Sequence, residues 1–554
     1  MHLGAFVAHE TVLHCDRCPD TLLFHSAELA GLVAPGRTFG YDVMIHAGEA
    51  VLRRNLTIEE TVAELSERNI RISASEVREL VARFIVSLGI AHAEAAPRLR
   101  RCLRQAGGYI LHLDSTCKGG SAHLLTGIDE ISGFVLLNAK IPSESGDEIR
   151  SFLRKLIKRF GRPVAVSSDM SRGILAAIAT ELKSTPVFIC HFHFLRDIGK
   201  DLMAQDYDTI RKCLRHHGLR AQLRRLQCGS RDVVGSHGGA LKSLLAAIES
   251  GQNDPVLACG LSHEALLGVF TTSILEAEDQ GDGCGFPFDR PHLLFLRQAQ
   301  AVMAAVETLL RGSLSMDKSE RRQWQRFVDM LRPTCTDSTL VATAASLEEK
   351  IRTFDQLRRA MRIAEPGTGA GLNDPGVDVP IRTIEHNVDA FCRQLRADKT
   401  RMSRKSYVTM LEQIDQYRGM LFADPIRIRT QQGVRMLQPQ RTNNILERFF
   451  RDINRSVCKR TGHGVSESFI NRMLPDTPLI ANLDNPKYVE ILLDDCETLV
   501  QRLARIDQKQ IDMTLTELRR PMTGLDRKVR ARLRNKATPA QIVNYVLVNM
   551  AQSN

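Results

Sequence analysis

Residues 108–120 read Gly108-Tyr-Ile-Leu-His-Leu-Asp114-Ser-Thr-Cys117-Lys-Gly-Gly120. Residue types that favour strands fill the run before Asp114, and glycines bound the stretch on both sides. We therefore predict a buried strand that runs into an aspartate and then into a glycine-rich turn. An aspartate in this position is usually a turn residue. A carboxylate held by a rigid strand at the rim of a sheet is, however, also well placed to bind a metal ion.

The next 80 residues alternate predicted strands and helices. Strands at 123–129 and 134–140 form a hairpin, an amphipathic helix covers 147–160, and a fourth strand at 163–168 ends on Asp169. A helix at 172–182 and a fifth strand at 185–190 follow. This order predicts an α/β ribonuclease-H-like core with a mixed five-stranded sheet, in which the first and fourth strands are neighbours. Asp114 and Asp169 would then meet, and a cation between them would relieve their repulsion.

Length and composition limit the class of protein. The 554 residues suffice for about three or four domains, and the net charge of +11 is concentrated in clusters at 98–101, 215–225 and 441–460. Clustered basic residues favour a polyanionic partner. Apart from Cys15 and Cys18, the 13 cysteines are scattered without paired spacing, there is no signal-peptide pattern, and no apolar run reaches membrane-span length. We expect a cytoplasmic protein with no membrane segment.

The first 105 residues contain two DNA-binding candidates. Cys15 and Cys18 in Cys-x-x-Cys spacing form half of a tetrahedral zinc site, which a histidine could complete; the alternative is an incomplete zinc-ribbon remnant at 1–50. Two amphipathic helices between residues 56 and 88 begin with the capping-box patterns Thr57-Ile-Glu-Glu60 and Ser73-Ala-Ser-Glu76. They predict either a helix-turn-helix within 51–105 or an ordinary helical hairpin.

A long, charged, helical stretch separates the first two carboxylates from the third. Residues 206–435 are predicted to be an α-helical insertion, and a strong amphipathic helix then begins near Arg441-Thr-Asn-Asn-Ile-Leu-Glu447. Thr442 or an adjacent asparagine is its predicted N-cap. Glu447 lies one turn inside, where a glutamate commonly just complements the helix dipole. The exposed sides of this helix are basic, with Arg448, Arg451, Arg455, Lys459 and Arg460.

Taken together, these motifs resemble the DDE transposases of bacterial insertion sequences, nearest the Mutator-like group. The resemblance covers about residues 108–205 and 436–490, and it rests on Asp114, on Asp169 in Ser-Ser-Asp-Met-Ser-Arg-Gly, and on Thr-Asn-Asn-x-x-Glu447-Arg. That group also has a Cys-x-x-His after the second aspartate, matched here by Cys190-His-Phe-His193, followed by a large helical insertion.

The resemblance implies an activity and a set of ligands. Asp114, Asp169 and Glu447 would bind two Mg²⁺ (or Mn²⁺) ions and catalyse cleavage and strand transfer at the ends of an element. The basic residues after Glu447 would hold the phosphates of double-stranded DNA. Synapsis of two ends implies a homodimer or a larger assembly. Cys190 and His193 would be structural or DNA-positioning residues, although metal ligation and a Cys–His nucleophilic pair are alternatives.

The predicted organisation has six parts, including a catalytic core split into 106–205 and 436–500 and a basic helical tail at 501–554. Two other functions fit the same residues. One is a ribonuclease-H-like nuclease or resolvase that cuts without joining. The other is a non-catalytic DNA-binding regulator that uses the helix-turn-helix.

Overall fold

The computed structural model has the predicted mixed sheet of five strands. In chain order they are β3 (Ile110–Thr116), β4 (His123–Asp129), β5 (Val135–Ile141), β6 (Ala165–Ser168) and β7 (Val187–Ile189), and their spatial order is β5-β4-β3-β6-β7. β3 is antiparallel to β4 and parallel to β6, with Leu113 level with Ser168. The prediction that the first and fourth strands are neighbours is therefore confirmed.

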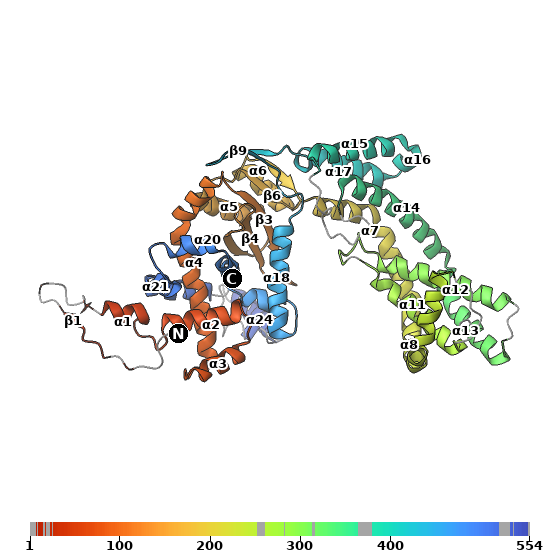
Figure 1. Ribbon diagram of the computed structural model, residues 1–554, viewed down its shortest axis with the longest axis horizontal. Coiled ribbons are helices and arrows are strands. Elements are labelled where there is room, and N and C mark those ends of the chain that lie inside the picture. The colour runs from red at the N-terminus through yellow and green to blue at the C-terminus, as the bar shows by residue number, and fades with distance from the viewer. Residues whose placement is uncertain are drawn as a thin grey trace. The chain divides into compact units, whose positions relative to one another are not determined.

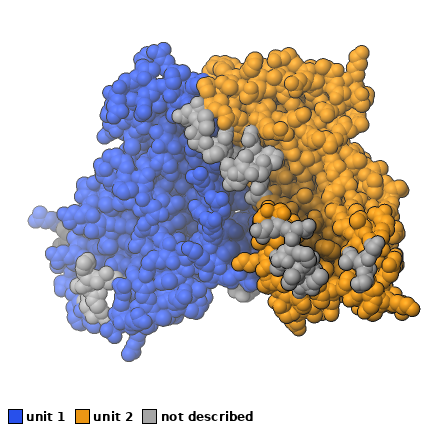
Figure 2. Space-filling model, turned by 45° about the vertical axis from the view of Figure 1, so that its right-hand side comes forward, with its two compact units in different colours: residues 1–187, 425–554 blue, residues 188–424 orange. Residues whose placement is uncertain are grey.

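The structure describes residues 7, 9–14, 17, 23–24, 26–251, 261–281, 283–312, 316–363, 379–519, 532–533, 535 and 537–551. Cys15 and Cys18 of the predicted zinc site lie outside these residues. The chain forms two compact units, residues 1–187 with 425–554 and residues 188–424 (Figure 2). The first unit begins with β1 (Leu13–His14), β2 (Leu23–Phe24) and α1 (Ala27–Leu32).

Helix α5 (Gly146–Phe160) makes the crossover that brings β6 parallel to β3. Its sequence is amphipathic, so one face packs into the core while charged residues cover the other. The helix ends before Gly161, whose φ of +87° lies in the left-handed region that favours glycine. α6 (Arg172–Glu181) follows β6 and packs against α5. The predicted helices at 147–160 and 172–182 are thus confirmed.

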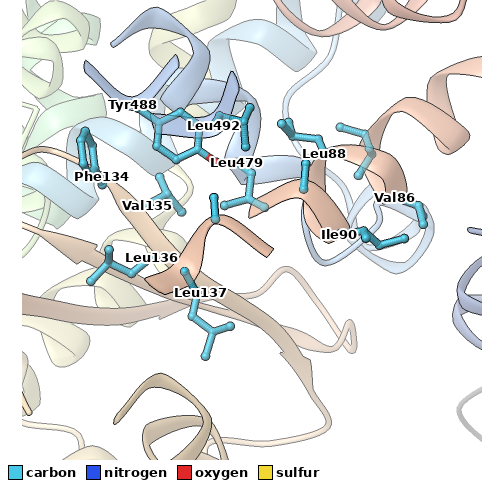
Figure 3. Packing of buried hydrophobic residues seen from close by; sticks show 14 of the residues in the cluster. Val86, Leu88, Ile90, Phe134, Val135, Leu136, Leu137, Leu479, Tyr488 and Leu492 are labelled. Carbon is cyan, nitrogen blue, oxygen red and sulfur yellow. The ribbon is translucent and has the colours of Figure 1, made fainter. Parts of the chain in front are cut away.

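Helix α4 (Ala74–Gln105) is the central core helix of the first unit. α2 (Tyr41–Leu52) and α3 (Ile58–Glu67) pack against it, and both predicted capping boxes are present, at Thr57 and at Ser73. α4 extends well past residue 88, where the sequence pattern had suggested an end, because its apolar face continues into the core. Figure 3 shows this face against β5 and the C-terminal segment, with labelled side chains Val86, Leu88, Ile90, Phe134, Val135, Leu136, Leu137, Leu479, Tyr488 and Leu492.

Two helices of the described chain, α4 and α12 (Pro291–Arg311), have the length and apolar content of a membrane span. In α4, 72% of the apolar window is buried inside the structure. α4 therefore has the burial of a core helix, as in soluble proteins.

After the second unit the chain returns to the first as a hairpin, β8 (Ile426–Thr430) and β9 (Gly433–Leu437), within the stretch predicted to be helical. Isoleucine and arginine alternate along Ile426-Arg-Ile-Arg, which is the two-residue period of a strand rather than a helix. The remaining elements are α18 (Asn444–Thr461), α19 (Glu467–Arg472), η2 (Thr477–Asp484), α20 (Pro486–Leu493), α21 (Leu499–Ala504), α22 (Gln508–Leu518) and α24 (Thr538–Ala551). α20, α21 and α22 contact α4.

The second unit is helical over its described residues from α7 onward, as predicted for the insertion (Figure 1). Its only tryptophan, Trp324, is buried and donates a hydrogen bond from Nε1 to His263 Nδ1 at 2.9 Å. Besides α12, its elements are α7 (His191–His217), α8 (Leu219–Ser236), α9 (Gly238–Glu249), α11 (His263–Glu276), η1 (Ala277–Asp279), α13 (Lys318–Cys335), α14 (Ser338–Met361), α15 (Ile381–Ala397), α16 (Lys399–Met402) and α17 (Lys405–Leu421).

Candidate active site

Asp114 and Asp169 lie at the same edge of the sheet. Asp114 is the residue after Leu113 in β3, and Asp169 directly follows Ser168 at the end of β6. Because Leu113 and Ser168 are level in parallel strands, the two aspartates occupy equivalent positions one residue further along. Asp114 Oδ1 accepts the N–H of Ser115 at 2.7 Å, and Asp169 Oδ1 accepts the N–H of Ser171 at 2.9 Å.

Helix α18 brings Glu447 to these aspartates. Its N-cap is Asn443, and the side chain of this residue donates from Nδ2 to Asp114 Oδ2 at 3.3 Å instead of capping the helix. The N–H of Glu447 donates to the carbonyl of Asn443 at 3.0 Å, so Glu447 lies one helical turn beyond that contact. Figure 1 shows α18 beside the sheet, and α18 contacts β3. The structure therefore places Glu447 close enough for its charge, like that of Asp169, to act on Asp114.

The charges of the neighbouring carboxylates act on Asp114. The pKa of Asp114 is raised well above its ordinary value, first by burial, then by the negative charge of Asp169, and further by Glu447 and Glu144. The hydrogen bond from Ser115 opposes the shift. The side chains whose charges act on Asp114 are thus all carboxylates. Binding of a cation is most favourable in such an environment.

A fourth carboxylate, Glu144, belongs to the same cluster and has no counterpart among the predicted site residues. Ser115 Oγ donates a hydrogen bond to Glu144 Oε1, and Ser171 Oγ donates to Glu144 Oε2 at 3.1 Å. His123 Nδ1 lies 3.5 Å from Glu144 Oε1. Glu144 thereby connects the residue after Asp114 with the helix start after Asp169. The only sequence signal was its position just after the third strand.

A second group of polar residues holds the start of α18 against β3. The buried His112 hydrogen bonds through Nδ1 to Asn443 Oδ1 and through Nε2 to Glu130 Oε2, both at 2.8 Å. Glu130 also accepts the N–H of Gln440 at 3.1 Å. The local sequence pattern predicts only a strand residue at His112 and a turn residue at Glu130. Their partner lies more than 300 residues away, which no local pattern reveals.

The predicted DNA-binding residues of α18 differ in exposure. Arg448, Arg451, Arg455 and Lys459 are exposed, and only Arg455 has an ion pair within the helix, at 3.7 Å to Asp452. Arg460 is partly buried: its guanidinium lies over the ring of Phe469, and burial lowers its pKa. The four exposed residues can reach a phosphate, whereas Arg460 packs against α19.

Cys190 and His193 lie at the start of the second compact unit. Cys190 is fully buried as the N-cap of α7, and His193 lies in the first turn of that helix. Burial, aided by Arg196 and Lys200, lowers the pKa of His193 to about 4, so the ring is neutral at physiological pH. This environment fits the predicted structural role.

The predicted helix-turn-helix contributes few free cations. The exposed start of α4 carries Glu76 and Arg78, and Arg78 pairs with Glu59 of α3 at 3.4 Å. Glu79 pairs with Arg519 from the C-terminal segment at 2.6 Å. Most of the middle of α4 packs into the core, so within the predicted helix-turn-helix only the first turns of α4 are available to a groove of DNA.

The donor set of the site fits a hard divalent cation. Asp114, Asp169, Glu447 and Glu144 offer carboxylate oxygens, which are the ligands that Mg²⁺ and Mn²⁺ prefer. Comparison with known proteins identifies no relative: no family model matches the sequence, and no curated protein matches it significantly. The functional assignment therefore depends on the geometry and chemistry of this site.

Proposed function

We propose that the chain is a metal-dependent DNA transposase of the DDE type with a ribonuclease-H-like core. One observation carries the proposal. Asp114 and Asp169 occupy equivalent positions along the neighbouring parallel strands β3 and β6, and Asn443, which begins the helix of Glu447, donates a hydrogen bond to Asp114. The charges of Asp169 and Glu447 both act on Asp114, which supports the proposal that carboxylates from distant parts of the chain bind two Mg²⁺ or Mn²⁺ ions at one phosphodiester.

When bound, such ions activate a water or a 3′-hydroxyl and stabilise the leaving oxygen. The protein's own residues supply position and charge. Ser115 and Asn443 fix the Asp114 carboxylate through hydrogen bonds, and Ser171 fixes that of Asp169. The exposed arginines of α18 neutralise and orient DNA phosphates next to Glu447.

The proposed reaction has two steps at the same site. A phosphodiester at each element end is first hydrolysed, and the freed 3′-hydroxyl then attacks target DNA. Both steps are in-line displacements at phosphorus, so one arrangement of carboxylates serves both. Because two ends must be joined together, the working form is a homodimer or a larger assembly on double-stranded DNA.

The test uses a labelled duplex carrying the inverted repeats that flank the coding region, a target plasmid and Mg²⁺. The proposal predicts cleaved ends and joined products with the wild-type chain, and neither with Asp114→Asn or Glu447→Gln. Asp452→Asn, on the exposed side of α18, is the matched control and should retain both products. Cleavage without joining would favour a nuclease or resolvase. Binding without cleavage would favour a DNA-binding regulator.

A further inference from the structure

An open basic hollow lies between α4 and α5 in the first unit. Its volume is about 750 Å³, and it is lined by Ala93, Ala96, Pro97, Arg100, Arg101, Arg104, Lys155, Lys158 and Arg159. Six of these nine residues are cationic, and none is acidic. We call these six cations the α4–α5 basic surface.

The α4–α5 basic surface lacks counter-ions within the described chain. No carboxylate of the described residues lies within ion-pair distance of any of the six side chains, whereas Arg98 and Arg154 nearby are paired with Asp494 and Glu181, both at 2.8 Å. The Nε atom of Arg100 is buried and has no hydrogen-bond partner among those residues. The charge of Arg159 acts on the buried Asp476, at longer range. The surface as a whole is available to an external anion.

Helix dipoles explain only part of this charge. Cations in the last turn of a helix are favourable, which accounts for Arg104 in α4 and for Lys158 and Arg159 in α5. Arg100 and Lys155 lie further from the helix ends. In addition, like charges four residues apart, as in Arg100 and Arg104, destabilise a helix. The like charges therefore repel one another in the isolated protein, and a bound anion would relieve this repulsion.

The surface lies at the opposite end of the strands from the carboxylates. α4 leads into the start of β3 and α5 into the start of β6, and Tyr109 Oη donates to the carbonyl of Gly161 at 2.6 Å where the two starts meet. Asp114 and Asp169 lie at the other ends. Asp114 is five residues beyond Tyr109, which separates the two sites by roughly 17 Å along the strand at about 3.3 Å per residue. A phosphodiester being cut at the carboxylates cannot also occupy the hollow.

From this placement we propose that the α4–α5 basic surface binds the backbone of a second segment of duplex DNA, separate from the phosphodiester in the carboxylate site. The exposure of the cations indicates that the partner is duplex DNA rather than a small anion. Arg101, Arg104, Lys155 and Lys158 are exposed on two helices, as contacts to a rod-like polyanion require, whereas a small anion is usually enclosed. That this DNA takes part in the reaction rests on the proposed function, whereas the binding of duplex DNA to the α4–α5 basic surface does not.

The test measures binding of the full chain to a labelled random-sequence duplex by fluorescence anisotropy, in EDTA and at several salt concentrations. The variant Arg101→Gln/Arg104→Gln/Lys155→Gln/Lys158→Gln should bind at least about tenfold more weakly, and its salt slope should fall by up to about 3.6, since each lost phosphate contact contributes about 0.9. Arg154→Gln, which removes a cation of α5 that already has a partner, is the matched control and should bind like wild type.

A second measurement does not depend on the variants. Bound duplex should protect Lys155 and Lys158 of the wild-type chain from acylation, and should leave Lys487, which pairs with Glu490, as reactive as before. Unchanged salt slope and unchanged lysine reactivity would overturn the proposal. So would loss of inorganic triphosphate binding in the variant with duplex binding intact, since that result identifies a small-anion site. Because the assay contains no divalent metal, its outcome is independent of cleavage and joining.

Discussion

The two ends of the β3–β6 strand pair carry opposite charge, and they are built in different ways. At the carboxyl ends, three carboxylates lie close enough to Asp114 for their charges to raise its pKa, and serine and asparagine donate hydrogen bonds to Asp114 and Glu144. At the amino ends, six cations surround an open hollow without counter-ions from the described chain.

The difference indicates two distinct uses of charge. The carboxylate end is partly enclosed, so small cations fit it better than a polymer does. DNA can approach this end only when the negative charge of the carboxylates is neutralised. The basic end is open and can bind a polyanion directly.

Removing one carboxylate should abolish the chemistry without removing DNA binding. Asp114→Asn, Asp169→Asn or Glu447→Gln should lower the rate of Mg²⁺-dependent cleavage by at least about 10³-fold, as expected for residues that act as a unit. Duplex binding in EDTA should be unchanged, because the basic surface is at the other end of the sheet. Asp452→Asn serves as the control on α18. Equal loss of binding and cleavage would mean that the two ends are not separate.

Acid should destabilise the core that lies between the two ends. His92 is buried, with Nδ1 2.8 Å from Tyr488 Oη and Nε2 2.8 Å from the carbonyl of Leu136. Burial lowers its pKa to about 4 from an ordinary 6.5, and the charge of Arg159 adds to the shift. On acidification, His92 takes up a proton in the unfolded chain before it does so in the folded chain. The free energy of unfolding therefore falls by about 3 kcal/mol as the pH drops from 6.5 towards 4.

Urea unfolding at pH 7.5, 5.5 and 4.5 measures this loss. The variant His92→Gln should be less stable than wild type at pH 7.5, yet it should lose less stability on acidification. The difference between the two pH profiles isolates His92 from the other titrating groups. Parallel profiles would show that the ring does not titrate on unfolding.

Glu144 should have a moderate effect on activity. Its carboxylate accepts hydrogen bonds from Ser115 and Ser171, which adjoin Asp114 and Asp169, so Glu144→Gln weakens the support of the site without removing a predicted ligand. We expect an activity loss on the order of tenfold, with a higher Mg²⁺ concentration needed for half-maximal rate. A loss as large as that of Asp114→Asn would instead make Glu144 a metal ligand.

The smallest expected effect concerns the stability of the metal-free chain. Burial and neighbouring carboxylates raise the pKa of Asp114, so its ionised form disfavours folding, and stability falls as pH rises above the ordinary value of 3.8. In EDTA at pH 7.5, Asp114→Asn should therefore raise Tm, by about 2 °C. Added Mg²⁺ should stabilise the wild type and reverse the order. A lower Tm for the variant in EDTA would contradict the electrostatic account.

Local sequence signals predicted much of the core. The strands that carry Asp114 and precede Asp169, the helix between them, and the capping boxes at Thr57 and Ser73 depend on neighbouring residues, and all are present in the structure, although β3 continues past Asp114 to Thr116. The return of Glu447 to the sheet could be predicted only through the family resemblance. Sequence periodicity cannot show which segments pack together after a long insertion.

The features that the sequence did not predict depend on tertiary contacts. The length of α4 follows from its packing against β5 and the C-terminal helices, and the β8–β9 hairpin interrupts a stretch that is otherwise helical. Glu144 and His112 acquire their roles from partners on other elements. Asn443 was predicted only as a helix cap, and its side chain instead contacts β3.

The central claim, that one metal site is formed by Asp114, Asp169 and Glu447, is tested most directly by replacing Mg²⁺ with Fe²⁺ and mapping oxidative backbone cleavage with ascorbate. Hydroxyl radicals formed at the bound iron cut only nearby backbone. The account predicts cuts close to residues 114, 169 and 447 together, all suppressed by excess Mg²⁺ and all absent in Asp114→Asn. Cleavage at only one of these segments, or cleavage that persists in the variant, would contradict it.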